Sequence, residues 1–306
     1  MPEPQPPRIT VRPMTEGDLG VTTLVRKAAL ESTLLSEGRT PEPWVPRDPV
    51  FHRHLLRTDP AGSFVAEIEG IVVGYSQALV RGDIWYLAQL FVQPEVHALG
   101  VGARVLDAAL QYAEARHARV IAVCSTASPS AQALYLRSGM MPVALLYTLR
   151  GPLAPLLELP APDGVGKRVV HCEGWQDRLA AVDRDVWGAE RRDDHALFAR
   201  SPEEHGVALL RDGEVRGYAW GRESDGWLGP VAARTPEEQL GLLRMLAETL
   251  LERGTEDGGV GALSRNPSVL RALLRAGWRI VRWTHFCTSA PFGQLDRYVP
   301  GSGFML

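Results

Sequence analysis

The chain has 306 residues, with 33 Lys and Arg against 36 Asp and Glu, so its formal net charge is −3. At roughly 150 residues a domain, this length predicts two domains. A composition of 45% apolar and 23% charged residues is typical of a soluble globular protein and excludes a disordered chain. The near-neutral balance also argues against a nucleic-acid partner held by bulk positive charge.

Three cysteines, Cys124, Cys172 and Cys287, are widely spaced and form no C-x-x-C pair. This spacing predicts neither a disulfide framework nor a zinc site, and it favours a reducing, cytoplasmic location. No run of 18 apolar residues occurs, so we expect no membrane-spanning segment. Residues 1–10 lack an apolar signal core, which predicts a short loose tail. We therefore expect no metal, membrane or nucleic-acid partner.

The first half alternates strands and helices. Residues 64–80 form a β-branched run that breaks at Glu69 and Gly70 and resumes, which predicts a hairpin. An apolar strand over 86–92 ends before a proline. A long amphipathic helix is predicted over 101–116, and a second helix over 128–140 opens on Ser and Pro and stops near a glycine.

A Pro- and Gly-rich segment without sustained periodicity, residues 151–166, separates the halves. We interpret it as a linker. The predicted domains are therefore 8–150 and 167–306.

The second half repeats the order of the first. Residues 207–223 match the first hairpin, with Gly217 corresponding to Gly74, and residues 266–278 match 128–140, with Asn266 corresponding to Ser128. A long amphipathic helix is again predicted between them, over 236–252. Two matches in the same order and at nearly the same spacing predict a duplication, with each copy of α/β or α+β class.

The segment 86–116 carries the most specific chemical signal. A strand is followed by a loop with Gly100 and Gly102 at the mouth of a helix. Missing side chains let a ligand approach the backbone there, and free N–H groups with the helix dipole favour a phosphate or pyrophosphate. Val105 stands where a dinucleotide-binding fold would have a third glycine, and no P-loop lysine follows.

The spacing resembles the acyl-CoA signature of the GCN5-related N-acetyltransferases (the GNAT superfamily). In that family a strand ending V-x-P is followed by Arg/Gln-x-x-Gly-x-Gly/Ala. Here Val92-Gln93-Pro94 precedes the segment 97–102, with His97 in place of the usual Arg or Gln. Residues 9–19 resemble the opening strand and first helix start. The S-x-x-A-x-x-L-Y-x-x-x-G segment at 128–139 resembles the later helix, so the resemblance covers roughly 8–150.

The resemblance implies two domains, each a mixed, mostly antiparallel sheet flanked by helices, with acetyl-CoA as co-substrate and no metal. Backbone N–H groups near Phe91 and Val92 would face the thioester, and the glycine loop would hold the pyrophosphate. The implied cofactor-binding residues are Phe91, Val92, His97, Ala98, Leu99, Gly100, Val101, Gly102, Ala103 and Ser128. Helix capping alone would also explain Ser128, and exposure to solvent alone would explain His97.

Tyr135 matches the proton donor of the family, because a phenol can protonate a departing thiolate of similar basicity. Packing of an amphipathic helix against the sheet is the alternative explanation, and the surrounding motif favours the proton donor. Many relatives have Glu where Gln89 stands, and glutamine cannot take a proton. Asp83, Glu31 and Glu37 are other carboxylate positions, and the sequence assigns none of them as the base.

The second half resembles the degenerate C-terminal domain of tandem acetyltransferases. Projecting Gly100 and Gly102 by the spacing that relates Ser128 to Asn266 gives Glu238 and Leu240, and glutamates at a helix start repel pyrophosphate. Tyr135 projects onto Leu273, which exchanges no proton. We expect this copy neither to bind acetyl-CoA in the usual way nor to catalyse.

The sequence therefore predicts an acyltransferase that moves an acetyl group directly onto a primary amine. The acceptor is a small molecule or a peptide, and a homodimer is one assembly the sequence allows. Two alternatives stay open: a non-catalytic acyl-CoA-binding or regulatory module, and a structural protein built from two decayed copies. Intact Gly100 and Gly102 favour the acyltransferase and the acyl-CoA-binding module over the structural protein.

Overall fold

A computed structural model describes residues 7–41, 49–161, 166–170 and 174–302, with backbone alone for 167–170. Packing divides the chain into two compact units. The first comprises Met1–Ile121 with Ser128–Leu134, and the second comprises Ala122–Ala127 with Tyr135–Leu306. The predicted class is confirmed, because both units have a mostly antiparallel sheet with flanking helices. No described helix is long and apolar enough to cross a membrane.

The first unit is built on an antiparallel sheet in the order β1-β2-β3-β4. Its strands are β1 (Ile9–Pro13), β2 (Ser63–Ile68), β3 (Ile71–Arg81) and β4 (Ile84–Val92). Its helices are η1 (Glu16–Asp18), α1 (Leu19–Ser36), α2 (Val50–Thr58), η2 (Pro60–Gly62), η3 (Pro94–Leu99) and α3 (Val101–Ala115). Helix α4 (Pro129–Arg137) crosses the boundary between the units at residue 134.

Both predicted hairpins are present, and the same turn chemistry forms them. Glu69 and Gly70 have φ of 52° and 80°, and Asp212 and Gly213 have φ of 52° and 79°. Two consecutive positive φ values define the two-residue turn whose twist matches that of paired strands, and glycine adopts such values at little cost. The shared turn shows the predicted internal similarity at the level of backbone geometry.

The two faces of the first sheet are covered differently. On one face Val92 packs against Val101 and Val105 of α3. On the other face Tyr75 packs with Val25 of α1. Helix α2 also contacts β3. The sheet therefore has one face closed by α3 and one face under α1 and α2.

The second unit carries the remaining elements. Its strands are β5 (Val120–Ser125, of which the part from Ala122 belongs here), β6 (Met141–Pro152), β7 (Gly166–Val170), β8 (Glu204–Arg211), β9 (Glu214–Arg222), β10 (Trp227–Ala233), β11 (Asp257–Leu263), β12 (Arg279–Thr288) and β13 (Tyr298–Val299). Its helices are η4 (Ala154–Glu158), α5 (Gln176–Val186), α6 (Arg192–Arg200), η5 (Glu223–Asp225), α7 (Pro236–Leu251), α8 (Pro267–Arg275) and η6 (Leu295–Arg297).

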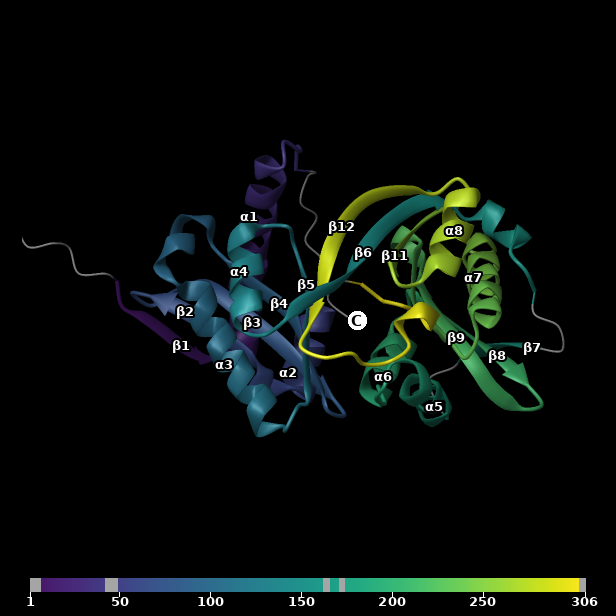
Figure 1. Ribbon diagram of the computed structural model, residues 1–306, viewed down its shortest axis with the longest axis horizontal. Coiled ribbons are helices and arrows are strands. Elements are labelled where there is room, and N and C mark those ends of the chain that lie inside the picture. Colours follow the sequence, from purple (N-terminus) through teal and green to yellow (C-terminus); the bar gives the residue numbers. More distant parts are fainter. Residues whose placement is uncertain (1–6, 42–48, 162–165, 171–173, 303–306) are drawn as a thin grey trace, which may run out of the picture. The chain divides into compact units, whose positions relative to one another are not determined.

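Strands from the two sequence halves interleave in the second unit. The strand β12, near the end of the chain, lies between β5 and β6 of the first half, and β6 also pairs with β11. Figure 1 shows β6 and β12 running side by side as a long curved ribbon. The boundaries of the two compact units therefore differ from those of the predicted domains, 8–150 and 167–306. The domain boundaries stay a prediction.

The predicted linker, residues 151–166, contains ordered structure where it is described. The strand β6 continues to Pro152, and η4 follows. Leu153 and Leu156 are fully buried in the main apolar core of the second unit. Burial of two leucines anchors this part of the segment to that core. Residues 162–165 lie outside the described residues.

Candidate active site

The glycine loop leads directly from β4 into α3. After Pro94–Leu99 the chain reaches Gly100, which has φ of +79° and precedes the first residue of the helix. An L side chain is strained in this left-handed conformation. A Cβ added to Gly100 would meet no atom within 4 Å, so the backbone is open to a ligand at this point.

The first turn of α3 offers unpaired donors to that open space. The intrahelical bonding starts with Arg104 N donating to Gly100 O at 3.3 Å. The N–H groups of Val101, Gly102 and Ala103 precede this bond and have no i−4 carbonyl within the helix. No acidic residue lies in the first turn. The helix dipole and these donors together form a site for an anion such as a pyrophosphate.

Close packing fixes the helix mouth against the sheet. Val101 is fully buried, and a Cβ on Gly74 of β3 would lie 2.8 Å from Val101 Cγ1. Such an approach is possible only where the strand residue lacks a side chain. Gly74 therefore lets α3 contact the sheet directly, which explains why this face of the sheet is closed.

The other predicted loop residues differ in exposure. His97, Ala98 and Leu99 are exposed, while Gly102, Ala103 and Phe91 are half-buried and Val92 is buried. His97 Nε2 lies 3.0 Å from Val92 O, and because a carbonyl only accepts, this nitrogen donates. His97 thus connects the loop to the end of β4, and only its Nδ1 remains to face a ligand.

Position 102 has room for a side chain larger than that of glycine. A Cβ there would lie 3.7 Å from Val92 Cγ2 and 3.8 Å from Leu134 Cδ2, which are ordinary contacts. The family-type glycine pair is therefore unequal in this chain. Gly100 is needed for its backbone conformation, whereas Gly102 has room for a methyl group.

Ser128 precedes α4. Its carbonyl oxygen accepts from Gln132 N at 2.9 Å, and its Oγ lies 2.9 Å from Ser130 Oγ on the exposed surface. Both observations fit a helix start. The predicted contact with a cofactor stays a prediction.

Tyr135 is buried on α4, and burial together with the nearby Cys287 raises its pKa above the usual value. A raised pKa keeps the phenol protonated at neutral pH, as a proton donor must be. Among the described residues its hydroxyl has no hydrogen-bond partner. The hydroxyl therefore has its proton available.

The carboxylates considered as bases lie on the surface. Asp83 pairs with Arg119 at 3.6 Å, Glu31 with Lys27 at 3.9 Å, and Glu37 interacts with Arg39. Exposed pairs of this kind are ordinary surface salt bridges. The structure brings none of the three into contact with Phe91, Val92 or the glycine loop among the described contacts.

Gln89 instead lies in a buried polar cluster under α1 and α2. Tyr75 OH donates to Gln89 Oε1 at 2.6 Å, and Gln89 Nε2 lies 3.2 Å from His52 Nε2. Gln77 Nε2 donates to the backbone oxygen of His52 at 3.2 Å. His52, Tyr75, Gln77 and Gln89 are each at most 3% exposed. We call these four residues the β4 cluster.

His52 was not among the residues singled out in the sequence. A signal was present, because the step along the chain from His52 to His195 is the same as the step from Tyr75 to Tyr218. The two rings of each pair are in contact, with centroids 6.0 Å apart in the first copy and 4.7 Å apart in the second. A histidine–tyrosine pair thus recurs at equivalent places of the two copies.

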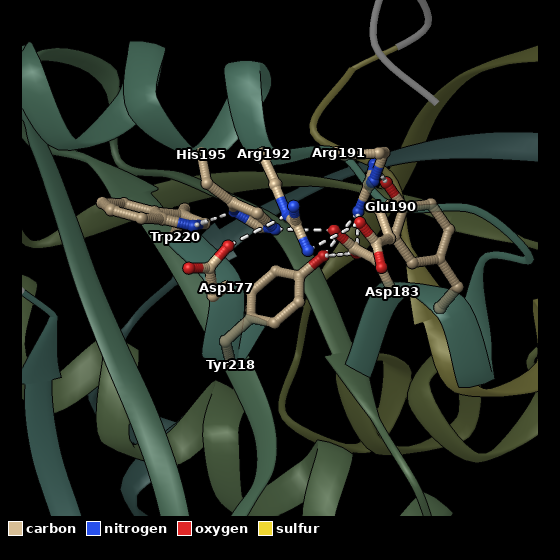
Figure 2. A network of polar contacts seen from close by, with 9 residues as sticks. Asp177, Asp183, Glu190, Arg191, Arg192, His195, Tyr218 and Trp220 are labelled. Carbon is tan, nitrogen blue, oxygen red and sulfur yellow. Dashed lines mark hydrogen bonds and ion pairs between the residues drawn. The ribbon is translucent and has the colours of Figure 1, made fainter. Parts of the chain in front are cut away.

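In the second copy this pair belongs to a closed network, shown in Figure 2. Trp220 Nε1 donates to His195 Nδ1 at 3.2 Å, so His195 Nε2 carries the proton and donates to Asp183 at 2.6 Å. Arg191 donates to Asp183 at 2.7 Å, and Tyr218 OH also donates to this carboxylate. Although burial raises it, Arg191 and His195 hold the pKa of Asp183 below its usual value.

The helix mouth of the second copy is also occupied. Thr235 caps α7 by accepting from Glu238 N at 3.2 Å, and Pro236 has no N–H to offer. The side chain of Glu238 is buried and accepts from Arg216 Nε at 2.9 Å. A negative charge and a capping side chain therefore occupy the place that is open in the first copy.

The sequence is similar to named acetyltransferases. Residues 29–140 match the acetyltransferase (GNAT) family. A mycothiol acetyltransferase of Actinosynnema mirum is 29% identical over 253 residues, covering 75% of this chain and 84% of that protein. An uncharacterized N-acetyltransferase of Archaeoglobus fulgidus is 34% identical over 77 residues, 23% of this chain and 52% of that protein. A mycothiol acetyltransferase of Rhodococcus jostii is 33% identical over 171 residues, 55% and 48% respectively. The match thus spans about half the length of two of these relatives.

Solved structures agree in fold. A GCN5-related N-acetyltransferase from Sphaerobacter thermophilus has a TM-score of 0.62 at 19% identity, covering 94% of this chain and 98% of that one. A tandem GNAT protein from the clavulanic acid biosynthesis pathway has a TM-score of 0.61 at 16% identity, covering 93% and 99%. The fold is thus that of tandem GNAT proteins. Over residues 29–140 the chain thus both matches the acetyltransferase (GNAT) family in sequence and has the fold of its solved members.

Proposed function

We propose that the protein transfers an acetyl group from acetyl-CoA to a primary amine, and that the first copy carries the site. The observation that carries this proposal is the open helix mouth at Gly100, where unpaired N–H groups and the dipole of α3 favour a pyrophosphate. The names of the relatives, which are acetyltransferases, support acetyl as the transferred group.

In the proposed reaction the amine nitrogen attacks the thioester carbonyl, a C–N bond forms, and the C–S bond breaks. Backbone N–H groups near Phe91 and Val92 would stabilise the oxyanion, which is worth roughly 2.7–4 kcal/mol for one well-placed donor. Tyr135, buried and protonated, would give its proton to the thiolate. The phenolate of Tyr135 then takes the proton that the acetylated nitrogen loses, which restores the phenol.

The second copy has a structural role in this proposal. The capped start of α7 with buried Glu238 opposes a pyrophosphate, and the network around Asp183 is saturated by its own partners. The alternative, an acyl-CoA-binding module without catalysis, is favoured by Gln89 at the position where relatives have a glutamate. Tyr135 argues against that alternative.

Titration calorimetry with acetyl-CoA, followed by a free-thiol assay across an amine panel, tests the proposal. We expect binding and thiol release. Tyr135→Phe should lower kcat by about 10²–10⁴-fold, the range for loss of a general acid, with little change in acetyl-CoA affinity. Binding without turnover on any amine would favour the module, and absence of binding would refute both readings.

A further inference from the structure

The strand β10 of the second copy changes its partner partway along its length. It first pairs in parallel with β11, at Trp227 and Leu228. A bulge follows between Leu228 and Val231. Beyond the bulge β10 pairs on one side with β9 and on the other with β13, which runs antiparallel to Val231 and Ala232. Because β13 also contacts β11, it lies in the opening where β10 and β11 separate.

Strand register relates this opening to the site of the first copy. Tyr75 pairs with Phe91 in the first copy. Tyr218, the counterpart of Tyr75, pairs with Ala232 in the second. Ala232 therefore stands at the place of Phe91, whose backbone the proposed function assigns to the thioester. The segment of the chain that contains β13 thus occupies the place given to the acyl-CoA arm in the first copy.

Tyr298 anchors β13 through its side chain. It is fully buried, as is its neighbour Val299, which belongs to the main apolar core of the second unit. Arg191 Nη1 donates to the Tyr298 hydroxyl, and the guanidinium carbon lies 4.9 Å from the centre of the ring. A charged hydrogen bond and a cation–π contact both stabilise this arrangement. Asp183 accepts from the same guanidinium (Figure 2) and so holds the cation in position for a tyrosine.

The backbone of the segment also has specific contacts. Asn266 Nδ2 donates to Tyr298 O at 3.4 Å, and Asn266 corresponds to Ser128, one of the implied cofactor-binding residues of the first copy. A Cβ added to Gly229 of β10 would lie 2.4 Å from Pro300 O. The segment can therefore lie this close to β10 only because position 229 has no side chain. The opening is shaped for the main chain of an extended peptide.

We propose that the second copy is a peptide-binding domain and that residues 295–302 are its ligand, carried on the same chain. Main-chain pairing with β10 positions the segment, as when a peptide adds a strand to a sheet, and the pocket beside Arg191 selects a tyrosine. This goes beyond the proposed function, because it requires no transfer in the first copy. The buried Glu238 only opposes a pyrophosphate, whereas these contacts assign the second copy a ligand of a different class.

Cutting the chain ahead of the segment tests the proposal, because a ligand stays bound without its tether. A protease site inserted after the exposed Pro291 lies in the loop between β12 and η6. After cleavage we expect the fragment that begins at Phe292 to remain with the rest of the protein in size-exclusion chromatography and native mass spectrometry. A labelled peptide of residues 292–302, added in excess, should then replace it.

Variants of the labelled peptide locate the recognition. Tyr298→Phe removes the hydroxyl that accepts from Arg191, and should weaken binding about tenfold or more. Tyr298→Ala removes the buried ring as well, and should weaken binding about thirtyfold or more. Asp296→Asn is the matched control, because Asp296 is exposed, and its Kd should stay within about threefold of the native peptide. Competition measured by fluorescence anisotropy gives all four constants.

Hydrogen exchange on the intact chain gives an answer that does not depend on the cut. A segment held as a ligand opens as a unit of its own, without unfolding the sheet that binds it. The amides of β13 should therefore exchange about tenfold or more faster than those of β9, which pairs with the other side of β10.

The outcomes are distinct. A retained fragment and weaker binding of both Tyr298 variants support the proposal. Loss of the fragment after the cut, or equal binding of the native and Tyr298→Ala peptides, would overturn it. If the cut chain unfolds, hydrogen exchange decides: β13 amides that exchange no faster than those of β9 would make β13 an integral strand and overturn the proposal. Failure of the proposed function is seen separately, as absence of thiol release.

Discussion

Gly100 and Gly102 stand two residues apart, yet their roles differ at the scale of single atoms. Gly100 has positive φ and open space beside it, while the Cβ position of Gly102 points toward Val92 and Leu134 at ordinary contact distance. The sequence motif treats the two glycines alike. Only backbone geometry separates them, because a motif does not specify where a missing Cβ would point.

The two glycines make a matched pair of variants. Gly100→Ala should cost about 1–2 kcal/mol of unfolding free energy through left-handed strain, and should weaken acetyl-CoA binding about tenfold or more. Gly102→Ala should leave the dissociation constant within about threefold, because its methyl group fits. Calorimetry and thermal unfolding measure both. Equal losses of affinity in the two variants would contradict the assigned geometry.

Glu204, at the start of β8, is a second single-residue test. Burial raises its pKa to about 7. A carboxyl whose folded pKa exceeds the unfolded value of about 4.5 stabilises the fold at low pH, and this contribution is lost as pH rises from about 4.5 through about 7. Glu204→Gln should therefore gain about 2–3 kcal/mol over the native protein at pH 8 and nothing at pH 4. Urea unfolding between pH 4 and pH 8 measures this, with exposed Glu203→Gln as control.

At the scale of elements, Asp59 connects three parts of the first unit. Its carboxylate accepts from Val80 N at 2.9 Å, from Tyr112 OH of α3 at 2.8 Å and from Arg81 at 2.8 Å. Its own position directly after α2 ties that helix to the sheet and to α3. A short turn containing one aspartate thus fixes how two helices meet β3.

Asp59→Ala should lower the unfolding free energy by about 3–5 kcal/mol, because it breaks a buried ion pair. Tyr112→Phe removes one of the same hydrogen bonds and should cost only about 1 kcal/mol. Denaturant unfolding of the two variants gives both values. One ordinary hydrogen bond contributes about 1 kcal/mol. A smaller loss than this in Asp59→Ala would show that other contacts, such as those of Arg81, hold α2 and α3 against β3.

Elements with strong local signals were predictable from sequence. The two hairpins, the helix after Gly100 and the helix opening at Pro129 follow from turn residues and periodicity, which act over a few residues. The β4 cluster was not predictable, because α2 brings His52 to Gln89 from a distant part of the sequence. No local pattern encodes such a contact. The shared spacing of the histidine–tyrosine pairs in the two copies was the one available signal.

At the scale of the whole molecule, the order of strands depends on both sequence halves. Both neighbours of β6 in the sheet, β11 and β12, come from the second half. The sequence showed the internal similarity of the two halves. It did not show that strands of the second half pair with β6, because the strands of both halves have the same alternation of apolar residues. Where two strands have the same hydrophobic pattern, the loops that connect them decide which one pairs with β6.

Residues 1–150 expressed alone should therefore aggregate, because both edges of β6 lose their partners. Coexpression with residues 151–306 should restore a soluble complex that copurifies. Size-exclusion chromatography and circular dichroism check both statements. A soluble, folded 1–150 fragment would show that β6 finds another partner within the first half.

The interleaving of β12 between β5 and β6 also sets a timetable for biosynthesis. After β6 ends at Pro152, most of the second half must be translated before β12 is complete at Thr288. At roughly 5–20 residues per second this takes on the order of 10 s. During that interval the edges of β5 and β6 that pair with β12 in the finished protein have no partner, because β12 is not yet translated. Slower translation of the second half would lengthen this exposure without altering a single contact of the finished protein.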